Sequence, residues 1–361
     1  MTDAQWMAQA IQLARKGQFS VHPNPLVGCV LVKNNRRIGA GWHQRAGQAH
    51  AEVEALRSAS ESVEGAIAYV TLEPCAHQGR TGPCVEALLE ARVSAVVIGM
   101  TDPNPLVAGK GIHRLRQAGI EVRTPVLEAE CRALNPGFLS LFERRRPYVV
   151  LKSAMSLDGR TALSNGRSQW ITSDAARADV QRHRALASCV LSTARTVLMD
   201  NARLTDRTFA PERHGRALVR VIIDRQLLLT PELNLFNDQS PLWILTVSDD
   251  QPKREALEHA GARVHRLVDG QLSSVMQFLT HERLGLVWVE AGATLSGQLL
   301  QEQWVDEWVV YLATTVLGDL GMPLVRLPSA LTELSQRLLF KQKSLRQVGQ
   351  DLRLVLTPTR A

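Results

Sequence analysis

The sequence predicts an α/β protein of two domains. Stretches typical of buried strands alternate along most of the chain with stretches that have the apolar spacing of amphipathic helices. A length of 361 residues exceeds what one hydrophobic core usually serves, which favours two domains. A short charged run ending in proline, at 143–147, interrupts the alternation. We therefore predict domains at 1–146 and 147–361.

The composition is that of an ordinary globular protein, with 45% hydrophobic and 21% charged residues. A net charge of +7 suits either nucleic acid or an anionic metabolite. Because the basic residues are scattered and only 5% of residues are aromatic, we expect a small-molecule partner rather than nucleic acid. The start of the chain reads as an amphipathic helix rather than a signal peptide, and no apolar run is long enough to predict a membrane span. An odd count of five cysteines argues against a disulfide framework and predicts a cytoplasmic location.

The first domain is expected to place helices on both sides of a sheet with mainly parallel central strands. Its opening helix is followed by a hairpin whose turn is Asn34-Asn35. After the hairpin we expect helices starting near His50 and Pro83 and a helix at 111–118, with strands at 66–72, 93–100 and 120–122.

The second domain is expected to open with a strand at 148–152. Ser173 can cap a helix that extends to about residue 187. Further strands are expected at 189–191, 219–223, 242–247 and 286–289. The segment Glu290–Leu295 follows a strand and opens a helix, and backbone N–H groups at such a turn can hold a phosphate.

Residues of types that bind zinc lie between His50 and Cys84. His50, Cys75 and Cys84 are suitable zinc ligands and would leave a fourth position for water. Zinc lowers the pKa of bound water to about 7, which makes hydroxide available for hydrolysis. Glu52, two residues after His50, could then move protons between water and a substrate nitrogen, as in zinc deaminases.

The two helix starts predicted at His50 and Cys84 would place both residues at helix N-termini, which favours a thiolate at Cys84. The alternatives are a solvated helix start, a pair of buried thiols, or a closed structural site with His77 as fourth ligand. The combination of motifs favours catalytic zinc. Asn24, between two prolines, could bind the amide edge of a substrate or simply form a turn.

At these motifs the sequence resembles the bifunctional deaminase–reductase family of bacterial riboflavin biosynthesis, over essentially its full length. The matching motifs are His22-Pro23-Asn24-Pro25, His50-Ala51-Glu52, Thr71–Cys75, Gly79–Cys84, Ser156–Arg160, Ser168–Thr172 and Glu290-Ala291-Gly292. Eight residues separate Cys75 from Cys84, whereas deaminases of tRNA or nucleosides usually have two at this place. The longer spacing favours the riboflavin family.

The resemblance implies a cytidine-deaminase-like three-layer α/β/α domain followed by a dihydrofolate-reductase-like α/β domain. The first would hydrolyse the 2-amino group of a diaminopyrimidinone that carries a phosphoribosylamino group. Its zinc ligands would be His50, Cys75 and Cys84, and Glu52 would carry the proton. The second would use NADPH to reduce the ribosyl group to ribityl, giving 5-amino-6-(5-phosphoribitylamino)uracil. A homodimer through the second domain is also implied.

The resemblance also implies residue roles. Those expected near the pyrimidine are Asn24, His77 and Arg80. The cofactor positions are Ala154, Trp170, Thr196, Asp200, Gly292, Ala293, Thr294 and Leu295. The positions for the substrate of the reduction are Ser168, Arg184, Leu204, Arg207 and Glu290. Lys152, Asp200 and Glu290 remain alternative proton donors for the reduction. The chain departs from the family pattern at Ser192–Arg195, Asn201-Ala202 and Arg225.

Two other functions stay open at this point. A nucleic-acid or nucleoside deaminase with an unrelated second domain would bind tRNA with a steep salt dependence. A ligand-binding protein with structural zinc would supply a fourth protein ligand to the metal.

Overall fold

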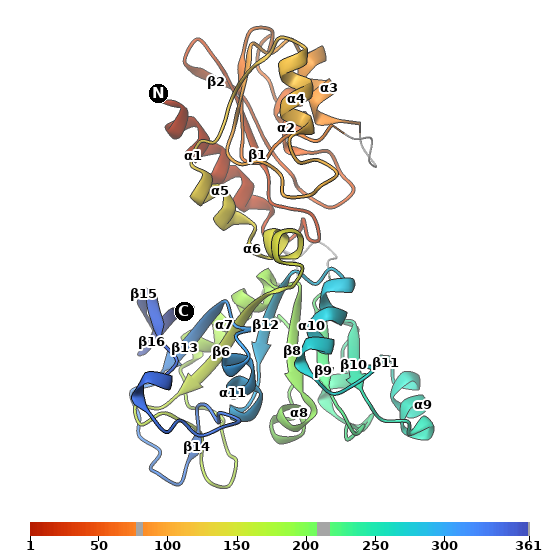
Figure 1. The fold of residues 1–361 in the computed structure, drawn as a ribbon, viewed down its shortest axis with the longest axis vertical. Coiled ribbons are helices and arrows are strands. Elements are labelled where there is room, and N and C mark those ends of the chain that lie inside the picture. The colour runs from red at the N-terminus through yellow and green to blue at the C-terminus, as the bar shows by residue number, and fades with distance from the viewer. Residues whose placement is uncertain (77–81, 208–216, 360–361) are drawn as a thin grey trace. The chain divides into compact units, whose positions relative to one another are not determined.

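The computed structural model describes residues 1–76, 82–207 and 217–359. The chain forms two compact units, one ending at Arg145 and the next beginning at Arg146 (Figure 1). None of the helices in the described ranges combines the length and apolarity that crossing a membrane requires.

Unit 1 alternates helices and strands. Its elements are α1 (Asp3–Ala14), η1 (Arg15–Gly17), β1 (Gly28–Lys33), β2 (Arg36–Trp42), α2 (Ala51–Arg57), β3 (Ile67–Val70), α3 (Cys84–Glu90), β4 (Ala95–Ile98), α4 (Lys110–Gln117), β5 (Glu121–Arg123), α5 (Glu128–Leu134), α6 (Pro136–Leu139) and η2 (Ser140–Arg144).

The sheet of unit 1 has the order β2-β1-β3-β4-β5. Strands β3, β4 and β5 pair in parallel, but β1 is antiparallel to both of its neighbours. The prediction of mainly parallel strands is therefore confirmed for β3, β4 and β5, and β1 is the antiparallel exception. Asn34 and Asn35, with φ of 51° and 55°, form the predicted tight turn. This turn sends β2 straight back along β1, and the chain crosses over β1 before it forms β3.

Helices cover both faces of this sheet, which confirms the three-layer α/β/α arrangement (Figure 1). On one face, α2, α3 and α4 bury residues such as Ala55, Leu88 and Leu115. On the other face, α1 contributes Trp6 and Met7 to a separate apolar cluster, together with residues of α5 and α6. Burying apolar side chains on both sides stabilises the sheet that carries the first site.

Unit 2 is larger. Its elements are β6 (Tyr148–Met155), β7 (Arg160–Ala162), α7 (Asp174–Leu186), β8 (Cys189–Thr193), α8 (Ala194–Asp200), β9 (Val219–Ile223), η4 (Asn234–Phe236), β10 (Leu242–Thr246), α9 (Gln251–His259), β11 (Ala262–Arg266), α10 (Leu272–His281), β12 (Leu286–Glu290), α11 (Ala293–Gln301), β13 (Glu307–Leu312), β14 (Met322–Pro323), η5 (Leu334–Gln336), β15 (Phe340–Val348) and β16 (Asp351–Pro358).

The main sheet of unit 2 has nine strands in the order β11-β10-β9-β8-β12-β6-β13-β16-β15. The pairings from β11 to β13 are parallel, and only the edge strands β16 and β15 pair antiparallel. Apolar clusters lie on both faces, as expected for parallel strands between helices. Strand β6 continues three residues beyond the predicted end, to Met155, because β13 pairs with it there. Ser173 caps α7 through Ala176 N, as predicted.

Candidate active sites

Three potential metal ligands converge in unit 1. His50 Nδ1 lies 3.1 Å from Cys84 Sγ and 3.6 Å from Cys75 Sγ. The three ligand atoms all lie within 4.8 Å of one another. Tetrahedral zinc with ordinary bond lengths spaces its nitrogen and sulfur ligands by roughly 3.5–3.8 Å. These side chains therefore fit a zinc ion with little movement.

The cluster offers three ligands. Within the described ranges, no fourth histidine, cysteine or carboxylate joins it. His77, the alternative fourth ligand, lies outside the described residues, as does Arg80. Three ligands leave one coordination position for water, which is the arrangement of catalytic zinc sites.

The ligands come from two helix starts and a loop. His50 is the N-cap residue of α2, and Cys84 is the first residue of α3, as predicted. Helix α2 lies directly on β2, since a Cβ on Gly41 would come within 2.3 Å of Ala55 N. Only glycine permits this approach, which sets the position of His50 relative to the sheet.

Glu73 anchors the loop that carries Cys75. Its carboxylate is buried and accepts four backbone N–H groups, from Asp102 at 3.2 Å, Gly109 at 3.0 Å, Gly111 at 2.9 Å and Ile112 at 3.2 Å. A carboxylate with this many donors ties the loop to the start of α4. Glu73 lies within the Thr71–Cys75 motif but was not predicted to have a role of its own. Its position beside the Pro74-Cys75 pair is the signal that could have singled it out.

Glu52 lies in the first turn of α2, only 3% exposed, beside the cluster. Its carboxylate faces the Cys84 thiol, and each group shifts the pKa of the other. Burial, assisted by the charge of Cys75, raises the pKa of Glu52 to about 7. A bound cation would lower the pKa of Glu52 instead. The carboxylate is therefore placed to exchange protons with a molecule at the open coordination position.

Without a metal ion, hydrogen bonding between the two sulfurs favours a thiolate at Cys75, and the thiolate at Cys84 stays a prediction for the zinc-loaded site. The Cys84 thiol donates a hydrogen bond to Cys75, which is the main reason that the pKa of Cys75 falls to about 4. The same hydrogen bond, followed by burial, raises the pKa of Cys84. Helix α3 has only seven residues, and its dipole is outweighed by the proton held between the sulfurs. Both cysteines must lose their protons to bind zinc.

His43 fixes the orientation of Asn24. The Nδ1 atom of His43 lies 3.0 Å from Ala49 O, and because a carbonyl can only accept, Nδ1 carries the hydrogen. Burial lowers the pKa of His43, which favours the neutral ring. Its Nε2 therefore accepts from Asn24 Nδ2 at 3.0 Å. Asn24 Oδ1 then makes no hydrogen bond within the described residues and can accept one from a ligand.

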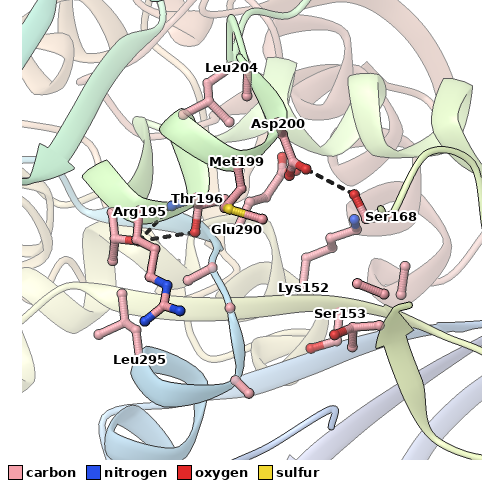
Figure 2. A pocket seen from close by; sticks show the side chains of 18 of the residues that line it. Lys152, Ser153, Ser168, Arg195, Thr196, Met199, Asp200, Leu204, Glu290 and Leu295 are labelled. Atoms are coloured by element: carbon pink, nitrogen blue, oxygen red, sulfur yellow. Dashed lines mark hydrogen bonds between the residues drawn. The ribbon is translucent and has the colours of Figure 1, made fainter. Parts of the chain in front are cut away.

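A second site lies in unit 2, in a cavity of about 1280 Å³. Its walls come from the carboxyl ends of the parallel strands β8, β9 and β12, from β6, and from the starts of α8 and α11. Ligands of parallel α/β sheets commonly bind at this edge. Every site residue predicted for the second domain lines the cavity, and Lys152, Ser168, Thr196, Asp200, Leu204, Glu290 and Leu295 are labelled in Figure 2. A Cβ on Gly292 would meet no atom within 4 Å, so the start of α11 is open to a ligand.

Glu290 and Arg184 form a buried ion pair in this cavity. Arg184 Nε lies 2.5 Å from Glu290 Oε1, and its Nη2 lies 2.9 Å from Oε2. Burial alone would raise the pKa of Glu290, but the charge and hydrogen bonds of Arg184 outweigh it and hold the pKa at about 2. Glu290 is therefore ionised near neutral pH. An ionised carboxylate has no proton to donate, so Glu290 is the least suited of the three predicted proton donors.

Lys152 and Asp200 remain as candidate proton donors for the predicted reduction. Lys152 is paired in register with Glu290 on the neighbouring strand. Burial lowers the pKa of Lys152, which brings it closer to the range suited to proton transfer, although Glu290 acts in the opposite direction. Asp200 Oδ1 accepts a hydrogen bond of 2.9 Å from Ser168 Oγ (Figure 2).

The departures from the family pattern have local structural roles. Asn201 ends α8 with φ of 43°, a left-handed conformation that asparagine tolerates better than most residues. Thr193 caps the same helix through Thr196 N. The Arg225 guanidinium donates to Gly270 O at 2.5 Å. The predicted site residues keep their places around the cavity.

The cavity is strongly basic. Among the described residues, three carboxylates line it, from Asp200, Asp224 and Glu290. The basic lining residues are Lys152, Arg177, Arg184, Arg195, Arg203, Arg207, Arg225 and Arg326. Most of these arginines were not predicted as site residues, because they are scattered along the chain and only the folded topology brings them together. An excess of positive charge favours ligands that carry several phosphates.

Two family models match the chain, one in each unit. The cytidine and deoxycytidylate deaminase zinc-binding region matches residues 1–100. The RibD C-terminal domain matches residues 147–354.

Several relatives match over nearly the whole chain. The riboflavin biosynthesis protein RibD of Escherichia coli K12 is 44% identical, with 98% of each chain covered. A solved structure of Acinetobacter baumannii RibD has a TM-score of 0.92 at 43% identity, with 99% of each chain covered. A Thermotoga maritima structure, described as a diaminohydroxyphosphoribosylaminopyrimidine deaminase/5-amino-6-(5-phosphoribosylamino)uracil reductase, has a TM-score of 0.88 at 34% identity, again with 99% of each chain covered.

Proposed function

This chain belongs to the RibD family of riboflavin-biosynthesis proteins, and from that premise we propose how its two sites divide the work. It is a bifunctional enzyme with a deaminase domain and a reductase domain. The deaminase acts on the diaminopyrimidine that carries the phosphoribosylamino group. The reductase then acts on the aminouracil product. The observation that supports this division most strongly is that His50, Cys75 and Cys84 lie together in unit 1, while the residues predicted for the reduction line one cavity in unit 2.

For deamination, we propose that zinc is held by His50 Nδ1 and by the Cys75 and Cys84 sulfurs. Bound zinc supplies a Lewis acid that makes water more acidic. Glu52 accepts the proton from the attacking water and passes it to the departing amino group, which leaves as ammonia. Asn24, oriented by His43, accepts a hydrogen bond from the pyrimidine through Oδ1.

For reduction, we propose that the cavity of unit 2 binds NADPH together with the aminouracil. Its volume of about 1280 Å³ exceeds the roughly 300–1,000 Å³ of a typical small-molecule pocket, which leaves room for both. NADPH supplies the hydride for the opened sugar. Lys152 donates the accompanying proton, and Arg207 binds the sugar phosphate. The Arg184–Glu290 pair binds the ribosyl chain.

The charge of the cavity supports NADPH over NADH, because the extra phosphate of NADPH adds negative charge where arginines predominate. Calorimetric titration of the zinc-loaded protein should show NADPH binding at least about tenfold more tightly than NADH, the worth of one charge-assisted hydrogen bond. The difference should shrink as salt is raised. Equal affinities would contradict the preference, and no binding of either nucleotide would contradict the cofactor itself.

The homodimer and the cytoplasmic location stay predictions. Strand β15 ends the large sheet, and Leu334, Leu338, Leu339 and Leu345, on or near it, are 38–81% exposed. Such a surface is suited to burial against a second copy. All five cysteines are free, which supports a reducing compartment.

A further inference from the structure

Glu290 is held by more than its ion pair. Trp288, two residues earlier on β12, is 2% exposed and donates its indole Nε1–H to Glu290 Oε1 at 2.9 Å. Arg184 Nε donates to the same oxygen at 2.5 Å.

The two carboxylate oxygens of Glu290 accept different numbers of hydrogen bonds. A carboxylate oxygen has two lone pairs, and those of Oε1 are both occupied, by Arg184 and Trp288. Oε2 receives only Arg184 Nη2, at 2.9 Å, among the described residues. One acceptor position therefore remains on Glu290, and it is on Oε2. A ligand hydroxyl can be accepted there.

The indole ring is itself held in place. It stacks on the His183 imidazole, with ring centroids 4.8 Å apart and an interplanar angle of 4°. His183 immediately precedes Arg184 on α7, so one helix supports both groups that donate to Oε1. His183 Nε2 lies 3.8 Å from Asp179 Oδ2 and 3.4 Å from Arg353 Nη1.

Asp179 completes this support. Its Oδ2 accepts from Tyr311 Oη and from Arg353 Nη1, each at 2.7 Å. These contacts connect α7 with β13 and β16 and leave the imidazole little freedom to rotate away from the indole.

We propose that Trp288 is a positioning residue of the reductase site. It occupies Glu290 Oε1 so that Oε2 alone accepts a hydroxyl group of the ribosyl chain. The inference rests on the proposed reduction of the ribosyl group. Without the indole N–H, Oε1 gains a vacant acceptor position that water or the substrate can use, and the orientation of the carboxylate is less restricted.

The test is Trp288→Phe, which keeps an aromatic ring against His183 and removes the N–H. The KM of the reductase for the aminouracil should rise about tenfold, the effect of one hydrogen bond to a charged group. We expect kcat to change less than about twofold, since the proton donor and the hydride path are untouched. NADPH affinity and deamination should stay at wild-type values. Trp243→Phe is the matched control, because the indole N–H of Trp243 is buried in the same unit without a hydrogen-bond partner.

A double-mutant cycle with Glu290→Gln separates positioning from a general packing effect. If Trp288 acts through Glu290, adding Trp288→Phe to Glu290→Gln should change KM less than about twofold. Additive effects, an unchanged KM in Trp288→Phe, or a joint fall in kcat and NADPH affinity would each overturn the inference. Failure of the proposed function is distinguishable, because the wild-type protein itself would then not reduce the aminouracil.

Discussion

Glu52→Gln should lower the rate of deamination by about 10²–10⁴, the usual contribution of a general acid–base residue. Glutamine has nearly the same shape as glutamate and can fill the buried position beside Cys84, but it cannot carry the proton from water to the leaving amino group. Reduction in unit 2 should be unaffected, because Glu52 belongs to the other unit. The measurement is the rate of ammonia release from the diaminopyrimidine, with NADPH oxidation followed separately on the aminouracil.

The matched control is Glu54→Gln on the same helix. The Glu54 carboxylate pairs with Arg57 at 2.9 Å on the surface, and this variant should deaminate at the wild-type rate. The zinc content of each variant should be measured, so that loss of metal is not mistaken for loss of the proton carrier. A Glu52→Gln protein that keeps zinc and deaminates at the wild-type rate would contradict the assigned role.

Arg184→Met should lower the free energy of unfolding of unit 2 by about 3–5 kcal/mol at neutral pH, because it leaves the Glu290 carboxylate buried without its partner. Both side chains are only 11–12% exposed, so solvent screens the pair weakly. Urea unfolding followed by tryptophan fluorescence measures this change, since most of the tryptophans lie in unit 2. They are Trp170, Trp243, Trp288, Trp304 and Trp308.

The loss of stability caused by Arg184→Met should depend on pH. The pKa of Glu290 is lowered from 4.5 to about 2 in the folded protein. The stabilisation from the pair is therefore fully present above the unfolded value and disappears as pH falls through the folded value. The difference between wild type and variant should narrow between pH 5 and pH 2. Arg254→Met, which breaks a surface pair with Glu258, should cost less than about 1 kcal/mol. An Arg184→Met variant as stable as this control at neutral pH would contradict the ion-pair account.

Local sequence motifs were enough to predict that His50, Cys75 and Cys84 lie together. His50 and Cys84 lie at helix starts that the apolar spacing and Pro83 already indicated. The turn at Asn34-Asn35 was predictable in the same way, because two asparagines between apolar runs favour a tight hairpin. The pairing of β1 with β3 was not predictable, since strand order depends on contacts between distant segments.

The residues that support the two sites could not be recognised from the sequence, because their partners are also distant along the chain. Glu73 acts on N–H groups that lie 29–39 residues further along the chain. Glu290 and Arg184 are separated by 106 residues, so neither residue signals the other in the sequence. The state of the two thiols also depended on the fold, because the hydrogen bond between the sulfurs outweighed the helix dipole. The residues around the second cavity came from family resemblance rather than from local chemistry.

The most direct measurement is mass spectrometry of the product made from the diaminopyrimidine phosphate, with NADPH and zinc each withheld in turn. With zinc but no NADPH, the product should show only the exchange of an amino group for oxygen. With both, it should also carry two added hydrogens. After zinc is removed by chelation, the substrate should keep its amino group. Deamination by the zinc-free protein at the wild-type rate would contradict the assignment of His50, Cys75 and Cys84 as the metal site on which the first reaction depends.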